Sequence, residues 1–292
     1  MPKEISPDAA LCPVNCRYCA VSKVSIRRSL WNERTLLGLN KAVTFVNPNP
    51  LKEGGLQNEL HDFEFSLLQS DVVCFNAISD PFWARWQEEF RFFLEAVRPY
   101  ARLITCVTKL PPSAEQWELI GGTPNFRLVV TVTGLNEIER VTTARRVRII
   151  EKALACGVRV FPLIHPYIAG MSNLSFLSDL ASLGIKYVDV KGLRYSDETM
   201  SSWINPASRS YYLNSQESEV LVEDGWRTQL DRAGLALMPL KEWYRIDMPA
   251  PSVNETQAEE LVDRLVPMCN ICSSDTVEAV RKSAIARRYK VY

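Results

Sequence analysis

Three cysteines near the start of the chain are the residues best suited to bind a metal. Cys12, Cys16 and Cys19 are separated by three and then two residues, so one loop can bring all three thiols to a single site. A zinc ion requires a fourth protein ligand, whereas three thiolates on a [4Fe-4S] cluster leave one iron open for an outside ligand. The spacing therefore favours an iron–sulfur cluster, with a zinc site and three unrelated thiols as the alternatives.

A second pair of cysteines, Cys269 and Cys272, has the two-residue spacing of a metal-binding turn. Two thiols alone do not complete a zinc or cluster site. Three interpretations remain open. The pair binds a second metal or cluster together with another cysteine or a partner chain, or it supplies a redox or radical-quenching thiol to the active site, or it is structural.

Two further candidates lie at the ends of predicted strands. His165, one of two histidines in the chain, is either a catalytic residue or an ordinary hydrogen-bonded core residue. Lys191 and Arg194 follow the last predicted strand of the repeating pattern. Cations there suit an anionic substrate or a cofactor carboxylate, although solvated strand ends carry such residues too.

The elements that would position these residues alternate regularly from about residue 70. Short apolar or β-branched runs alternate with longer amphipathic stretches, which is typical of a parallel sheet with crossover helices. Gly157 and Gly184 stand where helix C-terminal caps are expected. The predicted strands cover residues 72–76, 103–108, 127–133, 158–164 and 186–190, and the predicted helices cover 85–97, 114–120, 144–156 and 174–183.

With a first strand before Cys12, the chain has six βα units, too few for a closed barrel of eight. We therefore predict an α/β fold, a partial (β/α)6 TIM-type barrel over residues 1–195. The apolar run 42–47 predicts an accessory strand outside the barrel. Residues 196–292 should form a C-terminal α-helical extension that completes the active site. Its predicted elements are strands at 219–222 and 235–246 and helices at 225–233, 255–265 and 275–288.

The composition indicates a folded protein without a strong overall electric field. Of 292 residues, 47% are hydrophobic, and 34 Lys and Arg balance 34 Asp and Glu. Zero net charge disfavours a nonspecific nucleic-acid binder. We expect a cytoplasmic protein without a membrane span, because no signal-peptide pattern and no sufficiently long apolar run is present.

The Cys-x3-Cys-x2-Cys loop, with Tyr18 just before its third cysteine, resembles the cluster loop of the radical S-adenosylmethionine (radical SAM) enzymes. The resemblance implies a [4Fe-4S] cluster on Cys12, Cys16 and Cys19 whose open iron binds S-adenosylmethionine. It also implies reductive cleavage of that cofactor to a 5′-deoxyadenosyl radical, which abstracts a hydrogen atom from the substrate. Such an enzyme is oxygen-sensitive and depends on an electron donor such as flavodoxin or ferredoxin.

Over residues 12–195 the order of segments is similar to the spore photoproduct lyase-like branch, most clearly in the motif over residues 72–82. In that branch, a turn after the second barrel strand contacts the methionine amino group of the cofactor. The resemblance gives this role to Asn76, Ser79 and Asp80, with Phe82 in place of a tyrosine. The other implied cofactor contacts are Tyr18, Thr131, Thr133, Glu137, Arg145 (or Arg146 in its place), Asn173 and Lys191.

The substrate follows less directly from the sequence. Zero net charge and the lack of an obvious peptide-recognition module favour a small organic molecule. A nucleic-acid base or lesion is the alternative, because of the branch resemblance and the basic run over residues 281–292, and a peptide is third. A noncatalytic zinc- or cluster-binding protein is the alternative from a different functional class.

Overall fold

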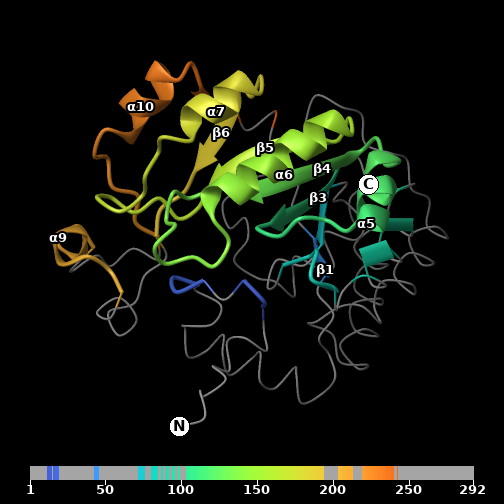
Figure 1. The fold of residues 1–292 in the computed structure, drawn as a ribbon, viewed down its shortest axis with the longest axis horizontal. Coiled ribbons are helices and arrows are strands. Elements are labelled where there is room, and N and C mark those ends of the chain that lie inside the picture. The colour runs from blue at the N-terminus through green and yellow to red at the C-terminus, as the bar shows by residue number, and fades with distance from the viewer. Residues whose placement is uncertain are drawn as a thin grey trace, which may run out of the picture.

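A seven-stranded sheet forms the centre of the protein (Figure 1). The computed structural model describes residues 12–14, 16–19, 43–45, 72–75, 80–84, 87, 90–91, 94–95, 98, 103–193, 203–212, 219–239 and 242. Within these, the strands are β1 (Val43–Phe45), β2 (Val72–Phe75), β3 (Leu103–Thr108), β4 (Phe126–Thr131), β5 (Arg159–Ile164), β6 (Tyr187–Val190) and β7 (Ala236–Leu237).

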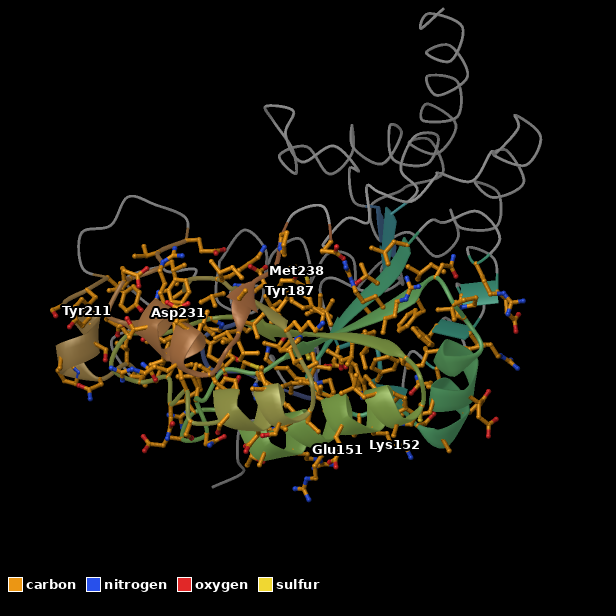
Figure 2. The ribbon with its side chains drawn as sticks, turned by 90° about the horizontal axis from the view of Figure 1, so that it is seen from above. Glu151, Lys152, Tyr187, Tyr211, Asp231 and Met238 are labelled. Atoms are coloured by element: carbon orange, nitrogen blue, oxygen red, sulfur yellow. The ribbon has the colours of Figure 1, made fainter. Side chains whose placement is uncertain are left out.

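The strands lie side by side in the order of the sequence. β1 pairs antiparallel with β2, and every following pair up to β6 and β7 is parallel. Sequential parallel neighbours joined by crossovers of one hand place their helices on one face of the sheet, as in a TIM-type barrel. In Figure 2 the helix that carries Glu151 and Lys152 lies on one side of the strands, with both side chains pointing away from the sheet.

The helices are α5 (Ala114–Gly121), α6 (Thr143–Ala155), α7 (Leu177–Ser182), α9 (Pro206–Arg209) and α10 (Trp226–Arg232). Their ends follow from local sequence. Ser113 and Gln116 form a capping box at the start of α5. After α6, Gly157 adopts a φ of +69°, and Val158 N–H donates to Ala153 C=O at 2.9 Å, which is a Schellman ending. None of the described helices has the length and apolar character needed to cross a bilayer.

The main core lies between the helices and the sheet. Alternate strand residues such as Leu128 and Val130 pack with Ile149 and Ile150 of α6 and with Trp226 of α10. On the other face of the sheet, Val129, Phe161 and Leu163 form a smaller apolar cluster. This alternation positions the strands, so the residues that follow their carboxyl ends are held on a rigid support.

The predicted repeat agrees with the structure from β2 to β6, where each strand boundary lies within two residues of its expected position. The accessory strand at 42–47 is confirmed as β1, antiparallel at the edge of the sheet. The strand proposed before Cys12 lies outside the described residues, so the sixth barrel unit and barrel closure remain predictions. The division of the chain at residue 195 is untested as well.

The predicted C-terminal extension needs correction in its described part. The helix expected at 225–233 is present as α10, but the strand expected at 219–222 is only an isolated antiparallel bridge between Val220 and Leu193. Of the strand expected at 235–246, the structure describes residues 235–239 and 242, and among these β7 forms the strand and pairs with β6. The described part of the extension thus adds a strand to the central sheet. The helices expected at 255–265 and 275–288 lie outside the described residues.

Candidate functional site

The carboxyl ends of the parallel strands meet at one edge of the sheet. Asp80 lies beyond β2, Lys109 directly follows β3, and Thr133 lies just beyond β4. His165 directly follows β5 and Lys191 directly follows β6. Active sites of parallel α/β proteins form at this edge, so it is the candidate functional site.

The cysteine loop packs onto this edge. Cys16 is 8% exposed and belongs to an apolar cluster with Leu135, which follows β4, and Ile168, which follows β5. Cys12 and Cys19 are half-buried and border the same cluster. Cys19 N–H donates to Cys16 C=O at 3.0 Å in a tight turn. All three cysteines are free thiols, held together by apolar packing rather than by a disulfide.

Burial favours the neutral form of these thiols. The pKa of Cys16 rises to about 12, mainly through burial; the ammonium of Lys109 acts against the rise and the carboxylate of Glu139 acts with it. Burial also raises the pKa of Cys12. A metal group that binds thiolates here must offset this desolvation with its own positive charge.

The donor set fits an iron–sulfur cluster. Among the described residues, no group of three or more His, Cys, Asp or Glu side chains is arranged to hold a single metal ion. Cys12, Cys16 and Cys19, three reduced thiols on one partly buried loop, have the chemistry that such a cluster requires.

Asp80 ties two loops of this edge together. Its Oδ1 accepts hydrogen bonds from the Thr108 hydroxyl at 2.8 Å and the Phe82 N–H at 3.1 Å. Its Oδ2 accepts from the N–H groups of Lys109 at 2.7 Å and Leu110 at 3.2 Å. Burial raises the pKa of Asp80, and the hydrogen bonds from Lys109, Thr108 and Phe82 oppose the rise. The carboxylate predicted to contact the cofactor is therefore occupied in fixing the turn after β2 against the end of β3.

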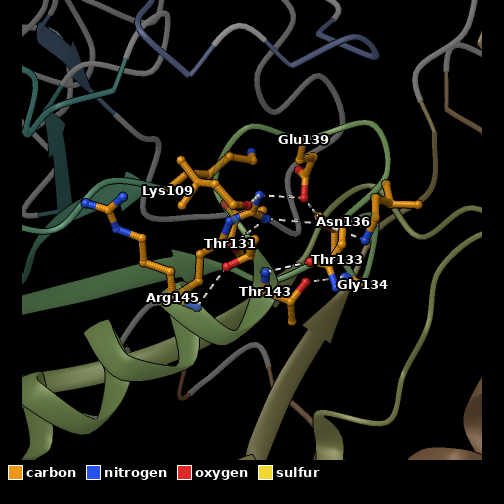
Figure 3. Close-up of polar contacts among 12 residues, drawn as sticks. Lys109, Thr131, Thr133, Gly134, Asn136, Glu139, Thr143 and Arg145 are labelled. Carbon is orange, nitrogen blue, oxygen red and sulfur yellow. Dashed lines mark hydrogen bonds and ion pairs between the residues drawn. The ribbon is translucent and has the colours of Figure 1, made fainter.

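A buried ion pair connects the cysteine loop to α6 (Figure 3). Glu139 Oε2 lies 2.5 Å from the Arg146 guanidinium, and both side chains are fully buried. The same oxygen accepts the Thr133 hydroxyl at 2.5 Å, and Oε1 accepts the phenolic hydroxyl of Tyr18. Arg146 also donates to the Thr131 carbonyl at 3.2 Å. Tyr18, Thr131 and Thr133, each predicted as a cofactor contact, are thus gathered at one buried network.

Burial and the nearby guanidinium of Arg146 have opposite effects on the Glu139 carboxylate. Burial raises the pKa of Glu139 to about 7, while the charge and hydrogen bond of Arg146 act against that rise. A buried carboxylate of this kind is stable only with a cation and further hydrogen-bond donors around it. Because Tyr18 lies between Cys16 and Cys19, its bond to Glu139 holds the cysteine loop in place.

The predicted charged contacts of this region differ in burial. Glu137 and Arg145 are exposed, whereas Arg146, the predicted alternative to Arg145, is buried, as is Glu139. In Figure 3 the Arg145 side chain extends away from Glu139. Glu139 was missed, although one signal was available: Arg146 lies three residues before Ile149, on the apolar face of α6. A buried arginine there requires a carboxylate partner.

The loops after β4 and β5 touch at Gly134 and Asn173. Asn173 N–H donates to Gly134 C=O at 3.2 Å, and a Cβ added to Gly134 would lie 2.1 Å from Asn173 O. The exposed Asn173 side chain accepts a hydrogen bond from Ser175 N–H at 2.9 Å. The backbone of Asn173 is therefore in contact with the residue that follows Thr133, and its side chain already stabilises a turn before α7.

His165 and Lys191 occupy the strand ends where they were predicted. His165 is half-buried. The Lys191 ammonium is 3.9 Å from Asp189 Oδ2, and its side chain is 42% exposed. The other predicted residues, Asn76, Ser79, Arg194, Cys269 and Cys272, lie outside the described residues, and their roles remain predictions.

This chain is distantly similar to SuiB from Streptococcus suis. The crystal structure of SuiB bound to S-adenosylmethionine matches with a TM-score of 0.36 and 12% identity, over 48% of this chain and 36% of that chain. A second SuiB structure matches with a TM-score of 0.38 and 11% identity, over 74% and 52% of the two chains. SuiB bound to its precursor peptide SuiA gives a TM-score of 0.34 and 12% identity, over 56% and 43%.

The matched region thus spans about half of the SuiB chain or less. At these TM-scores the similarity does not establish a shared activity. No family model matches the sequence, and no curated protein is significantly similar to it.

Proposed function

We propose that this protein is a radical SAM enzyme in which Cys12, Cys16 and Cys19 hold a [4Fe-4S] cluster. Bound by these cysteines, the cluster would supply one-electron reduction of S-adenosylmethionine, in which the C5′–S bond would break to give methionine and a 5′-deoxyadenosyl radical able to take a hydrogen atom from the substrate. The electron comes from an external low-potential donor of the flavodoxin or ferredoxin class.

One observation carries this proposal. The cysteine loop, with Cys16 buried, packs on the carboxyl edge of a parallel sheet whose strands follow one another in sequence. Three thiols without a fourth cysteine in the same loop leave a coordination position for an outside ligand. At this edge, residues from several strands are available to hold that ligand.

The side chains of the edge divide into two proposed roles. Glu137, Arg145, Asn173 and Lys191 are exposed or half-exposed at the strand ends, so their polar groups are accessible for the carboxylate, ribose or adenine of the cofactor. Asp80, Thr131, Thr133 and Tyr18 are buried in hydrogen-bonded networks. We propose that these buried side chains have a positioning role. They hold the cysteine loop and the loops at the strand ends in fixed positions relative to each other.

A small organic molecule is the proposed substrate class, because the chain has no net charge to attract a polyanion. A nucleic-acid base or lesion, as in the spore photoproduct lyase-like branch, is the alternative, and a peptide is third. Oligonucleotide binding measured at low salt separates the first two, since phosphate contacts are strongest there.

Anaerobic reconstitution with iron and sulfide tests the proposed function. We expect the wild type to bind about four irons and four sulfides per site, to show the electron paramagnetic resonance signal of a reduced cluster, and to form 5′-deoxyadenosine with dithionite and S-adenosylmethionine. Replacing Cys12, Cys16 and Cys19 together with alanine should abolish all three results. Cys156→Ala is the matched control, because Cys156 is an exposed free thiol after α6.

Two outcomes would overturn the proposal. A wild type that binds zinc tightly and forms no cluster would indicate a noncatalytic metal-binding protein. A wild type that holds a cluster and never cleaves S-adenosylmethionine would exclude the radical enzyme. Iron retained by the triple variant would instead point to a second cluster, for which Cys269 and Cys272 are the candidates.

A further inference from the structure

We propose that the ammonium of Lys109 raises the reduction potential of the cluster held by the cysteine loop. This inference rests on the proposed function, because it concerns the cluster placed on Cys12, Cys16 and Cys19. It adds a role for a residue at the end of β3 that the sequence pattern did not single out.

The backbone of Lys109 is fixed by Asp80. Asp80 Oδ2 accepts the Lys109 N–H at 2.7 Å and the Leu110 N–H at 3.2 Å. The Thr108 hydroxyl donates to Asp80 Oδ1 at 2.8 Å, so the residues on both sides of Lys109 are held as well. The side chain of Lys109 therefore starts from a backbone position that these hydrogen bonds hold fixed.

The side chain of Lys109 reaches the cysteine loop. Its Nζ lies 5.6 Å from the centre of the Tyr18 ring, within the range of a cation–π contact. Tyr18 is between Cys16 and Cys19 and is itself anchored on Glu139. Tyr18 and Cys16 belong to the same buried cluster. A half-buried cation is thus held against the loop that carries the predicted cluster ligands.

Other charged groups of this region are engaged with each other or with backbone. Glu139 and Arg146 form a fully buried ion pair at 2.5 Å. The Asp80 carboxylate accepts backbone N–H groups of Lys109 and Leu110. Arg17, next to Cys16 in the loop, is exposed, so solvent screens its charge more than it screens the charge of the half-buried Lys109.

A cation at this position changes the energy of cluster reduction. The reduced cluster carries one more negative charge than the oxidised cluster, so a fixed positive charge nearby stabilises the reduced form more. Partial burial strengthens the effect, because solvent screens the charge less than at an open surface. Lys109 should therefore make the cluster easier to reduce by its electron donor.

A redox titration of the reconstituted full-length protein, followed by electron paramagnetic resonance without S-adenosylmethionine, tests this proposal. Lys109→Met keeps the apolar stem and removes the charge. We expect the ratio of reduced to oxidised cluster at a fixed potential to fall about tenfold, which equals a shift of about 59 mV for one electron. Lys109→Arg, which keeps the charge, should restore the wild-type ratio to within about threefold.

Lys152→Met is the matched control for charge. Lys152 is exposed on α6 and points away from the sheet (Figure 2), so its loss removes one positive charge from the protein without approaching the loop. The ratio should stay at the wild-type value. Iron and sulfide contents of each variant show that the same cluster is being compared. Lys109→Gln provides a second neutral variant if Lys109→Met binds cluster poorly.

The outcomes separate this proposal from the proposed function. Neutral variants with a full cluster and an unchanged potential would overturn the role of Lys109 and leave the radical SAM assignment intact. An equal shift in Lys109→Arg and Lys109→Met would also overturn it, since the effect would then come from shape and not from charge. If the wild type forms no cluster, the proposed function itself fails.

Discussion

Tyr18 donates its phenolic hydrogen to the carboxylate of Glu139, a residue 121 positions farther along the chain. This bond joins the cysteine loop to the segment between β4 and α6, and Arg146 holds the carboxylate from the other side. The loop that would carry the cluster is therefore fixed by a buried polar network in addition to apolar packing. Substitutions in this network and in the neighbouring strand-end loops should have distinct, measurable effects.

Removing the cation of the buried pair should destabilise the protein in a pH-dependent way. Arg146→Met leaves the Glu139 carboxylate without its partner, and breaking such a pair costs about 3 kcal/mol or more. Arg145→Met, at an exposed neighbouring position, should change stability by less than about 0.5 kcal/mol. Urea unfolding of the apoprotein measures both.

The pH dependence of the Arg146→Met variant follows from Glu139, whose pKa is about 7 when folded against an ordinary value of 4.5. Because the folded protein binds the Glu139 proton more tightly than the unfolded chain does, this group contributes stability that is fully present below pH 4.5. That contribution is lost as the pH rises through the folded pKa of about 7. Without Arg146 this pKa moves higher, so the variant goes on losing stability above pH 7, where the wild type no longer does. The loss of stability of Arg146→Met relative to wild type should therefore grow between about pH 6 and about pH 9. It should grow by about 1.4 kcal/mol for each unit by which the substitution raises the pKa of Glu139. A deficit independent of pH would contradict the prediction.

Tyr18→Phe should loosen the cysteine loop. The variant keeps the ring and removes the hydroxyl that donates to Glu139, so one carboxylate oxygen loses a partner at a cost of about 2 kcal/mol. Hydrogen–deuterium exchange of the peptide that contains Cys16 and Cys19 should become faster. Tyr187→Phe, at an exposed tyrosine of β6, is the control and should leave exchange in that peptide unchanged. Equal exchange in wild type and Tyr18→Phe would show that apolar packing alone holds the loop.

Asp80→Asn should damage the turn after β2 even though the substitution conserves size. An amide has one acceptor oxygen, whereas the two carboxylate oxygens of Asp80 accept four hydrogen bonds. The NH2 group would face donors, leaving buried groups unpaired at a cost of about 3 kcal/mol. Asp231→Asn, exposed on α10, is the comparison and should be nearly neutral. A fully stable Asp80→Asn protein would argue that Asp80 is not structural and favour its direct contact with the cofactor.

Gly134→Ala should be far more harmful than Gly157→Ala. Both glycines have φ values near +70°, so each substitution carries the cost of a left-handed residue, about 1 to 2 kcal/mol. Only at Gly134 would the new Cβ meet backbone, 2.1 Å from Asn173 O, while nothing lies within 4 Å at Gly157. The midpoint of thermal unfolding compares the two variants directly. Similar losses would mean that the loops after β4 and β5 separate without cost.

The local elements and the cysteine motif could be predicted from the sequence because their signals are short-range. Strands β3 to β6 appear as short apolar runs, and Gly157 and Gly184 mark the ends of α6 and α7. The spacing of Cys12, Cys16 and Cys19 by itself limits the metal chemistry that one loop can support. The placement of candidate residues at strand ends follows from the parallel repeat in the same way.

Only the tertiary structure decided which polar side chains are buried and which partners they contact. Glu137 and Glu139 have the same chemistry and lie two residues apart, yet only Glu139 is buried against Arg146 and Tyr18. Asp80 is engaged by residues that follow a different strand, and Lys109 becomes relevant only because β3 ends beside the cysteine loop. Hydrophobic periodicity indicates which face of a helix or strand is buried. It does not indicate which side chain from a distant segment packs against that face. That choice depends on packing between segments far apart in the chain.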